Sequence, residues 1–344
     1  MKKAQRRRFI AAIVAMLAVA AVVSVAPVAL GEALRAGTGT SNGPTSGVVV
    51  VETRLGYEAG SAAGTGIVVS STGEVLTNNH VIRGATAIRV VVASGRRYAA
   101  RVVGYSVSKD IAVLQLRAAS GLQTAALGDS TDVSVGDRVT AVGNAGGSGT
   151  LVTASGSVTA LGRAITVSDD AGGASRLTGL IATNARLVPG DSGGPLLRQG
   201  RVVGIDAAAS RDFRFQGSGS RGFAIPIDTA VDIASQIETG QRSVTVHIGP
   251  TAFLGVGLQP SGSLGQDVRG AIVQSVVPGS PADTVGINPQ DVITSFGGQR
   301  VSSSAKLRSL VLQVSPGRVQ RLVWIDPYGG TNRATVRPVA GPPQ

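Results

Sequence analysis

Three residues in this sequence could together hydrolyse an acyl bond: His80, Asp110 and Ser192. Such a reaction needs a nucleophile, a base that takes its proton, a group that orients the base, and donors for the oxyanion. Ser192 lies in PGDSGGPLL, where glycines on either side allow a tight loop that can turn the amides of Gly190 and Ser192 inward. We therefore expect Ser192 to be the nucleophile and Gly190 and Ser192 to supply the oxyanion donors.

The base must be one of only two histidines, His80 in LTNNHVI or His247 in TVHIGP. We interpret His247 as an isolated exposed histidine, which leaves His80 as the base. The orienting carboxylate is expected at Asp110, in SKDIAVLQL, at the start of an apolar strand. The order His80, Asp110, Ser192 along the chain is that of the two-barrel serine proteases and not that of subtilisin or α/β-hydrolase folds. The sequence thus predicts a cleft between two barrels, with His80 and Asp110 on the first and Ser192 on the second.

The elements that must hold these residues read as short strands separated by turns. Strands are expected at 67–70, 87–93, 101–105 and 111–116, and then at 139–143, 157–161, 179–183, 202–206 and 223–225. Glycine is abundant, at 48 residues, and aromatic residues make up only 3% of the chain. This composition is typical of many short strands with glycine turns. The sequence therefore predicts a mostly β protein with two successive all-β units, which favours paired small barrels over a βαβ sheet.

A separate small domain is expected after the two β units. Residues 226–238 read as a helix that ends the second unit, and residues 241–250 as a linker. Strands are then expected at 253–258, 271–276 and 321–325, with a helix at 304–314 whose apolar residues have helical spacing. This predicts a mixed α/β domain of about 90 residues.

Composition bounds the functions that the chain can have. The 344 residues carry a formal net charge of +12, and 43% of them are hydrophobic and 15% charged, so buried cores are expected and wholesale disorder is not. The basic residues are scattered and no stacking aromatics lie among them, which argues against nucleic-acid binding. With no cysteine and two histidines, the chain has no disulfide and no multi-histidine zinc site.

Residues 1–36 are interpreted as a signal peptide or a membrane anchor. A basic start precedes an apolar run over residues 9–30, which is expected to form a leader helix. The length of this run favours an anchor, because a cleaved signal has about 7–15 apolar residues and a spanning helix about 20. Pro27 and the small residues after Ser24 favour cleavage, and both alternatives stay open. In either case the protein is expected to be exported and to touch a membrane only through this segment. Residues 37–47 are expected to form a flexible linker between this segment and the rest of the chain.

Several motifs resemble those of the HtrA family of serine proteases: GTGIVVSSTGEVLTNNHVI, DIAVLQL, PGDSGGPLL and GFAIPI. The stretches LGYEAGSAAGTGIVVSSTGEVLTNNHVI and VHIGPTAFLG are similar in particular to actinobacterial members such as the mycobacterial PepA-like proteins. The likeness covers about residues 48–340. It implies a chymotrypsin-like double β-barrel at 48–240 followed by one PDZ domain at 251–340. It also implies that His80 is the general base, Asp110 its orienter and Ser192 the nucleophile.

The resemblance further implies an exported endopeptidase that cuts unfolded or damaged proteins, often as a homotrimer, without a metal or another cofactor. In the PDZ domain, Ala252, Phe253, Leu254 and Gly255 would capture the C-terminal carboxylate of a peptide, with the following strand edge and the helix at 304–314 forming the groove. Two alternatives are a chaperone-like or scaffold protein with little turnover, and an esterase that uses the same triad. The complete triad favours the protease over the scaffold, and a peptide-binding domain favours it over the esterase.

Three positions depart from the family pattern. Asp191 stands where many members have asparagine, Asn184 where the family commonly has aspartate, and Arg186 where relatives generally have a small residue. Because Arg186 and Asp191 lie in one loop, one hypothesis is that they form an internal ion pair that orders the oxyanion loop. The alternatives are a solvated Arg186, or a basic pocket that selects acidic residues at the cleavage site.

Overall fold

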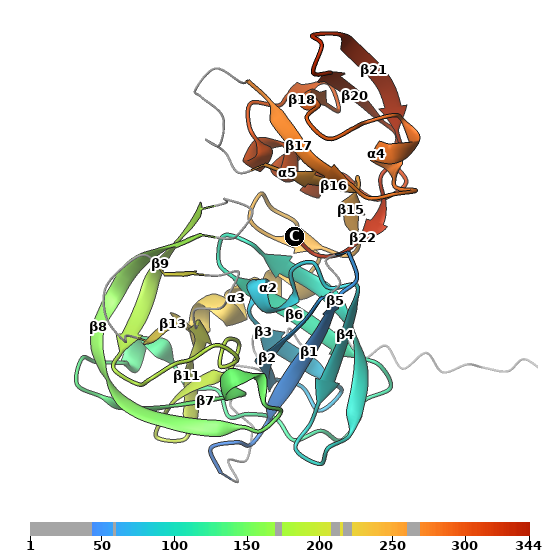
Figure 1. Cartoon of the computed structure of the whole chain (residues 1–344). Helices are drawn as coiled ribbons and strands as arrows, with labels where there is room; N and C mark the ends of the chain where they lie inside the picture. The colour runs from blue at the N-terminus through green and yellow to red at the C-terminus, as the bar shows by residue number, and fades with distance from the viewer. Residues whose placement is uncertain (1–42, 58–59, 169–173, 208–213, 216–221, 260–268) are drawn as a thin grey trace, which may run out of the picture.

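The computed structural model describes residues 43–57, 60–168, 174–207, 214–215, 222–259 and 269–344. The expected leader at 1–36 and most of the linker at 37–47 lie outside these ranges. None of the helices within them is long and apolar enough to cross a membrane. The described chain forms an N-terminal part, coloured blue to yellow in Figure 1, and a smaller C-terminal domain, coloured orange to red.

The first half of the N-terminal part is a barrel. Its strands are β1 (Val48–Leu55), β2 (Gly60–Val68), β3 (Glu74–Thr77), β4 (Ala87–Val91), β5 (Arg97–Ser106) and β6 (Ile111–Leu116). A single helical turn, α2 (Asn79–Ile82), follows β3. The strands run in the order β5-β4-β1-β2-β3-β6, and pairing of β5 with β6 closes the ring. Closure leaves no unpaired edge in the ring, which stabilises a small all-β unit.

The second half repeats this architecture. Its elements are η1 (Ser130–Asp132), β7 (Arg138–Gly143), η2 (Ala145–Gly147), β8 (Val152–Ser168), β9 (Ala174–Thr183), β10 (Pro195–Arg198), β11 (Arg201–Ala207), β12 (Arg214–Phe215), β13 (Gly222–Pro226) and α3 (Ile227–Glu238). The order β8-β7-β10-β11-β13-β9 is closed by pairing of β8 with β9, and β12 pairs with β8. The expected pair of barrels is therefore confirmed.

One apolar core joins the two barrels. Ile67 and Leu76 of the first barrel are buried in the same cluster as Val142 and Ile205 of the second. Helix α3 adds its buried face to this cluster, and its Ile237 lies against β5 of the first barrel. Full burial of an aliphatic side chain of this size contributes about 1.5–3 kcal/mol. The shared core therefore fixes one barrel against the other. A site that is built from residues of both barrels needs such a fixed arrangement.

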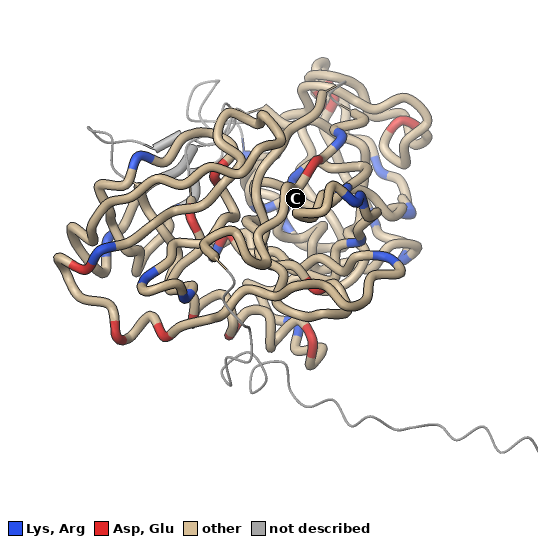
Figure 2. The backbone as a smooth tube through the Cα atoms, turned by 90° about the horizontal axis from the view of Figure 1, so that it is seen from below, with Lys and Arg blue, Asp and Glu red and all other residues tan. Residues whose placement is uncertain are grey.

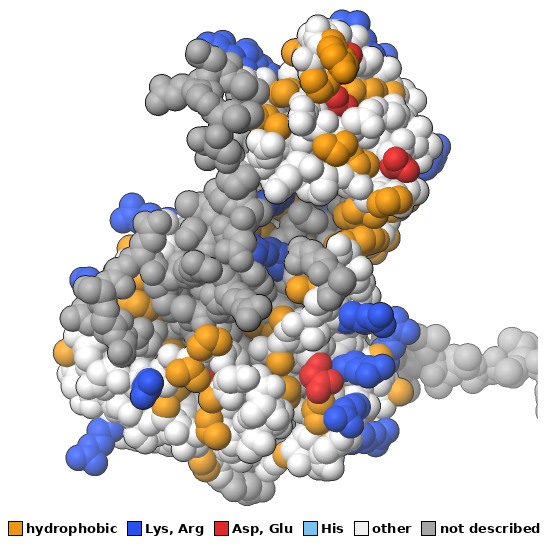
Figure 3. All heavy atoms as spheres, viewed as in Figure 1, with side chains coloured by type: hydrophobic (Ala, Val, Ile, Leu, Met, Phe, Trp, Pro, Cys, Tyr) orange, Lys and Arg blue, Asp and Glu red, His pale blue; other side chains and the backbone are white. Residues whose placement is uncertain are grey.

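Charged side chains follow the alternation that a half-buried sheet requires. Lys and Arg are spread over both parts of the chain, and Figure 3 shows one group of them over the first barrel (Figures 2 and 3). The strand registers place Arg54, Arg89, Arg97 and Arg101 on one outward face together with Glu52. Residues two apart on a strand share a face, so the alternate positions supply the core. These exposed arginines point to solvent and do not hold the barrel together.

The C-terminal domain has a core of its own, with Phe296, Leu307 and Trp324 buried in it. Its elements are β15 (Thr251–Phe253), β16 (Val256–Leu258), β17 (Ala271–Val276), α4 (Pro281–Thr284), β18 (Val292–Phe296), β19 (Gln299–Arg300), α5 (Ser304–Leu312), β20 (Gln320–Ile325), β21 (Thr331–Val336) and β22 (Val339–Gly341). The main sheet has the order β16-β17-β18-β20-β21, with β19 on β18, and β15 pairs with β22 in a second, small sheet. The expected mixed α/β domain is therefore present.

Two segments differ from the sequence expectation. The strand expected at 253–258 is interrupted at Leu254 and Gly255, because Gly255 has φ +84°, a left-handed conformation that cannot continue a strand. The expected linker at 241–250 contains a short strand, β14 (His247–Ile248), that pairs with β5 of the first barrel. The connection between the domains is therefore attached to the first barrel.

Candidate active site

The turn α2 presents His80 to Asp110. The His80 ring Nδ1 lies 2.8 Å from Asp110 Oδ2, and the His80 backbone amide donates to Asp110 Oδ1 at 2.9 Å. Both side chains are largely withdrawn from solvent, at 7% and 4% exposure. The two contacts use both carboxylate oxygens, so they fix the orientation of the ring and place a proton on Nδ1. This leaves Nε2 as the basic nitrogen that could take a proton.

Asp110 is itself held in an uncommon backbone conformation. It has φ 54°, which costs free energy for most residues but is tolerated by aspartate. Asn78, directly before α2, is fully buried and donates from Nδ2 to the Asp110 carbonyl at 2.9 Å. The strand β6 begins at the next residue and is buried along most of its length. The predicted base and orienter are therefore brought together, and Asn78 is a supporting residue that sequence reasoning missed.

The loop with Ser192 depends on two glycines. Gly190 and Gly193 have φ +100° and +85°, and a Cβ at these positions would lie 2.1 Å from the carbonyl oxygens of Asn144 and Thr65, respectively. Thr65 of β2 anchors the loop from the first barrel: its amide donates to the Ser192 carbonyl at 2.8 Å, and its hydroxyl donates to the Gly190 carbonyl at 2.7 Å. Glycine is therefore required at positions 190 and 193 by the close approach of neighbouring backbone.

Ser192 lies against the turn that carries His80. A Cβ built on Gly64 would meet both the side chain of Val81 in α2 and the carbonyl of Ser192, at 2.7 Å and 3.2 Å. Only the missing side chain of Gly64 lets these two segments approach each other so closely. The structure therefore places Ser192 of the second barrel beside the turn of the first barrel that carries His80.

The backbone before Ser192 leaves a donor available. The Pro189 carbonyl accepts a hydrogen bond from the Gly146 amide at 2.7 Å. In a trans peptide the C=O and the N–H point in opposite directions, so the Gly190 amide is turned away from Gly146. No residue in the described ranges accepts a hydrogen bond from the Gly190 amide. This is the state that a donor to an oxyanion needs before substrate arrives.

Asp191 does not form the ion pair with Arg186 that one hypothesis proposed. Arg186 is exposed, and in the described structure Asp191 Oδ2 accepts only from the Val188 amide, at 2.9 Å, while Oδ1 has no hydrogen-bond partner. Burial raises the pKa of Asp191. Asn184, which lies earlier in the same loop, carries no charge. Its side-chain oxygen accepts a hydrogen bond from the Ser157 amide at 2.7 Å, and this bond ties the loop to β8.

A second buried carboxyl group, that of Asp206, lies near Asp191 and was not expected from the sequence. Among the residues that the structure describes, neither of its carboxyl oxygens has a hydrogen-bond partner, and the side chain is fully buried in β11. Burial raises the pKa of Asp206 well above its usual value, and the negative charge of Asp191 raises it further. An acidic residue inside the apolar run VVGIDAA is the signal that could have drawn attention to it.

His247 is buried, which corrects its interpretation as an exposed histidine. Pairing of β14 with β5 places it opposite Tyr105, and the two rings lie 4.9 Å apart. Its Nδ1 is 3.2 Å from the carbonyl oxygen of Leu312 at the end of α5. Burial, with a smaller effect from the charge of Arg242, lowers the pKa of His247 although its backbone hydrogen bonds oppose the shift. This histidine belongs to the contact between the domains and not to the triad.

In the AFLG stretch, Ala252 and Phe253 end β15, and Leu254 and Gly255 form the loop between β15 and β16. Within the described residues, the amides of Leu254 and Gly255 donate no hydrogen bond. Phe253 stacks on Tyr57, which follows β1, with ring centroids 4.9 Å apart and planes inclined by 18°. At the far end of β16, Ser304 Oγ donates to the Gln259 carbonyl at 2.9 Å and ties the start of α5 to this strand.

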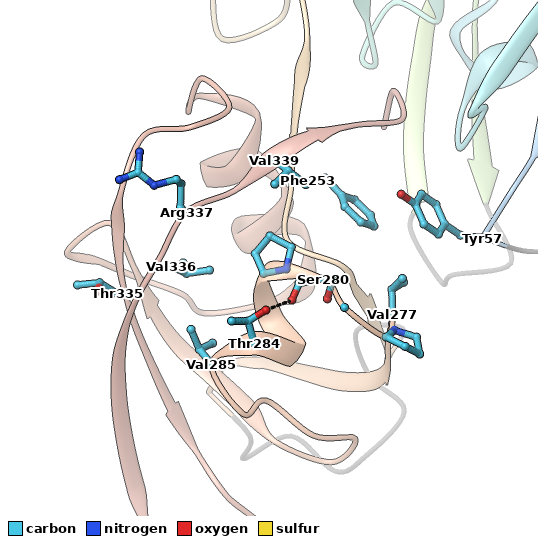
Figure 4. Close-up of a pocket in the computed structure, with 13 residues that line it drawn as sticks. Tyr57, Phe253, Val277, Ser280, Thr284, Val285, Thr335, Val336, Arg337 and Val339 are labelled. Atoms are coloured by element: carbon cyan, nitrogen blue, oxygen red, sulfur yellow. Dashed lines mark hydrogen bonds between the residues drawn. The ribbon is translucent and has the colours of Figure 1, made fainter.

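A groove of about 480 Å³ lies beside Phe253 (Figure 4), and no residue of β16 or α5 lines it. It is lined by Tyr57 and Phe253, by α4 and the residues before it, and by the end of β21 and the start of β22. Ser280, which also lines the groove, lies against Gly255 of the AFLG stretch, because a Cβ on Gly255 would lie 2.1 Å from the Ser280 Cβ. Across the described ranges, no three His, Asp or Glu side chains come together to hold a metal ion.

Two family models match the chain: a trypsin-like peptidase domain over residues 64–205 and a PDZ domain over residues 252–323. The "Probable periplasmic serine endoprotease DegP-like" of Hahella chejuensis is 38% identical over 277 residues, which cover 77% of this chain and 54% of that protein. The "Periplasmic pH-dependent serine endoprotease DegQ" of Escherichia coli is 37% identical over 268 residues, covering 75% of this chain and 55% of that protein. The chain spans about half the length of these curated relatives.

A solved structure is also similar. It is described as "HtrA-type protease AlgW with decapeptide", and it is 25% identical in sequence with a TM-score of 0.49. The match covers 89% of this chain and 100% of that one.

Proposed function

The chain belongs to the HtrA/DegP family of serine proteases, and from this premise we propose that it is an exported endopeptidase that cleaves unfolded or damaged proteins. In this proposal Ser192 is the nucleophile, His80 the general base, Asp110 its orienter, and the Gly190 and Ser192 amides the oxyanion donors. The observation that carries the proposal is the pair of contacts, 2.8 Å and 2.9 Å long, that hold His80 to Asp110 beside the glycine loop of Ser192.

The proposed reaction follows from these positions. Ser192 Oγ attacks the scissile carbonyl while His80 Nε2 takes its proton, and the charge of Asp110 stabilises the imidazolium that results. The oxyanion is stabilised by the two amides, each of which contributes about 2.7–4 kcal/mol in enzymes of this kind. His80 then gives the proton to the leaving amine, and water hydrolyses the acyl-enzyme by the same steps.

The C-terminal domain is proposed to capture peptides by their C-terminal carboxylate at Ala252, Phe253, Leu254 and Gly255. The amides of Leu254 and Gly255, which donate no hydrogen bond within the described structure, support this role because a carboxylate needs such donors. The peptide would lie between β16 and α5, as an added strand.

Casein degradation by the wild type and by Ser192→Ala tests the proposed activity. Loss of the nucleophile of a triad lowers kcat by about a million-fold, so Ser192→Ala is expected to be inactive. Ser134→Ala is a matched control, because Ser134 is exposed on the second barrel, and it is expected to retain full activity. Equal, absent turnover in the wild type and in Ser192→Ala would contradict the protease and leave the chaperone-like or scaffold function.

Three finer proposals rest on the sequence resemblance. The protein is proposed to be closest to actinobacterial PepA-like members, to assemble as a homotrimer, and to be either secreted or anchored by residues 1–36. Light scattering on the purified protein measures the oligomer. N-terminal sequencing of the mature protein separates a cleaved signal peptide from a retained anchor.

A further inference from the structure

The segment 341–344 leaves the C-terminal domain and contacts the turn that carries His80. The Gly84 amide donates to the Pro343 carbonyl at 2.9 Å, and Asn79 Nδ2 donates to the Gln344 carbonyl at 3.0 Å. The Gln344 amide in turn donates to the hydroxyl of Tyr105 on β5 at 3.3 Å. Pro342 and Pro343 are buried, so the segment is packed against the first barrel and is not a loose tail.

These contacts fall on both sides of His80. Asn79 precedes the histidine in α2, and Gly84 follows the end of the turn. A helix of four residues is unstable by itself, since its hydrogen bonds do not offset the cost of nucleating it. Asn78 at its start also makes no side-chain cap. The orientation of α2 therefore depends on contacts from outside, and segment 341–344 supplies one at each end.

The same segment continues the strand that pairs with the proposed peptide-binding loop. In the β15–β22 sheet, Thr251 is paired with Gly341 and Phe253 with Val339. The hydroxyl of Thr251 also lies 3.0 Å from the hydroxyl of Tyr105. The segment thus connects the strand before Leu254 and Gly255 to the turn of His80 over a few residues of backbone.

We propose that segment 341–344 is a positioning element of the protease: it holds α2, and through α2 it holds His80 against Asp110. The C-terminal domain then contributes to catalysis even for a substrate that it does not bind. The inference rests on the proposed function, because its consequence is a change in the reactivity of the proposed triad.

The first test is the full chain without residues 342–344, assayed on a short fluorogenic peptide whose C-terminus is amidated so that the peptide-binding loop cannot capture it. Removing the segment takes away both contacts to α2. Small displacements of a catalytic group lower rates by up to about 100-fold, and we expect kcat to fall about 10- to 100-fold while KM changes less than about twofold. An unchanged kcat in the folded variant would overturn the proposal.

Two further variants separate positioning from general loosening of the domain. Tyr105→Phe keeps the buried ring against His247 but removes the hydroxyl that contacts Gln344 and Thr251. We expect it to lower kcat in the same direction as the truncation, by a smaller factor, and an unchanged kcat would count against the proposal even if the truncated chain failed to fold. Arg337→Ala is the matched control, because Arg337 contacts the Gly317 carbonyl inside the C-terminal domain, and kcat is expected to stay unchanged.

A spectroscopic measurement tests the position of His80 without relying on activity. The chain has only two histidines, so isotope-labelled histidine gives an NMR spectrum in which the Nδ1 proton shared with Asp110 can be assigned. We expect this resonance to shift or broaden in the truncated chain and in Tyr105→Phe. If the wild type and Ser192→Ala are equally inactive, the proposed function fails. The spectrum still shows in that case whether segment 341–344 holds His80 against Asp110. A resonance identical to that of the wild type in both variants would overturn the inference.

Discussion

At the scale of single residues, the acidic pair Asp191 and Asp206 is the feature of the site that is hardest to reconcile with a stable fold. A buried carboxylate without partners costs free energy unless it binds a proton. Burial raises the pKa of both Asp191 and Asp206, and the negative charge of Asp191 raises the pKa of Asp206 further. The loop of Ser192 is therefore built over a group that holds a proton more tightly than the same residue in an unfolded chain.

Asp206→Asn is expected to stabilise the protein at neutral pH. Because the pKa of Asp206 is raised by folding, the folded state binds more protons than the unfolded state above the ordinary aspartate pKa, and stability falls as the pH rises through this range. An asparagine carries no charge and avoids this loss. We expect the free energy of unfolding to increase by about 1–3 kcal/mol at about pH 7, measured by urea denaturation, with little change at about pH 4.

The control for this substitution is Asp132→Asn, at an exposed position of the second barrel. It is expected to change the free energy of unfolding by less than about 0.5 kcal/mol at either pH. Ionisation of Asp206 would not explain the result if Asp206→Asn raised the free energy of unfolding equally at both pH values, or did not raise it near neutral pH.

At the scale of elements, residue types and chain order were enough to predict the proposed triad, but they could not predict the residues that support it. The contacts of Thr65 with the Ser192 loop join residues more than a hundred positions apart, and the sequence around each residue does not predict them. The buried state of His247 likewise depends on pairing with a strand about 140 residues earlier. Strand β22 was missed because its sequence, VAG after a proline, is too short to show alternation.

The loop between β15 and β16 gives an element-scale prediction. Gly255→Ala would place a Cβ 2.1 Å from the Ser280 Cβ on a residue with φ +84°, so the loop must move away from α4. We expect the affinity for a labelled peptide with an apolar C-terminal residue to fall at least about tenfold, measured by fluorescence anisotropy, because the amides of the loop are displaced.

Gly279→Ala is the matched control within the same domain. Gly279 has φ +72°, a similar backbone strain, but a Cβ there has open space around it. Its peptide affinity is expected to remain within about twofold of the wild type. If both substitutions weakened binding equally, backbone strain and not contact with Ser280 would explain the result for Gly255→Ala.

At the scale of the whole molecule, several separate contacts join the C-terminal domain to the first barrel. Leu312 at the end of α5 packs against the core of the first barrel and shares its carbonyl with His247. Tyr57 stacks on Phe253 at the other end of the contact. His247 Nε2 is buried in this contact without a hydrogen-bond partner within the described structure, so a proton added there would have no acceptor and would carry an uncompensated buried charge.

Acidification is therefore expected to loosen the contact between the domains. Burial lowers the pKa of His247 in the docked state, so the undocked state binds the proton more tightly, and docking weakens as the pH falls below the ordinary histidine pKa of about 6.5. We expect the radius of gyration from X-ray scattering to increase between about pH 7 and about pH 5, and His247→Phe, which keeps an aromatic ring beside Tyr105, to abolish the increase. His80→Ala removes the only other histidine and should leave the increase intact; an increase that survives in His247→Phe would show that another group controls docking.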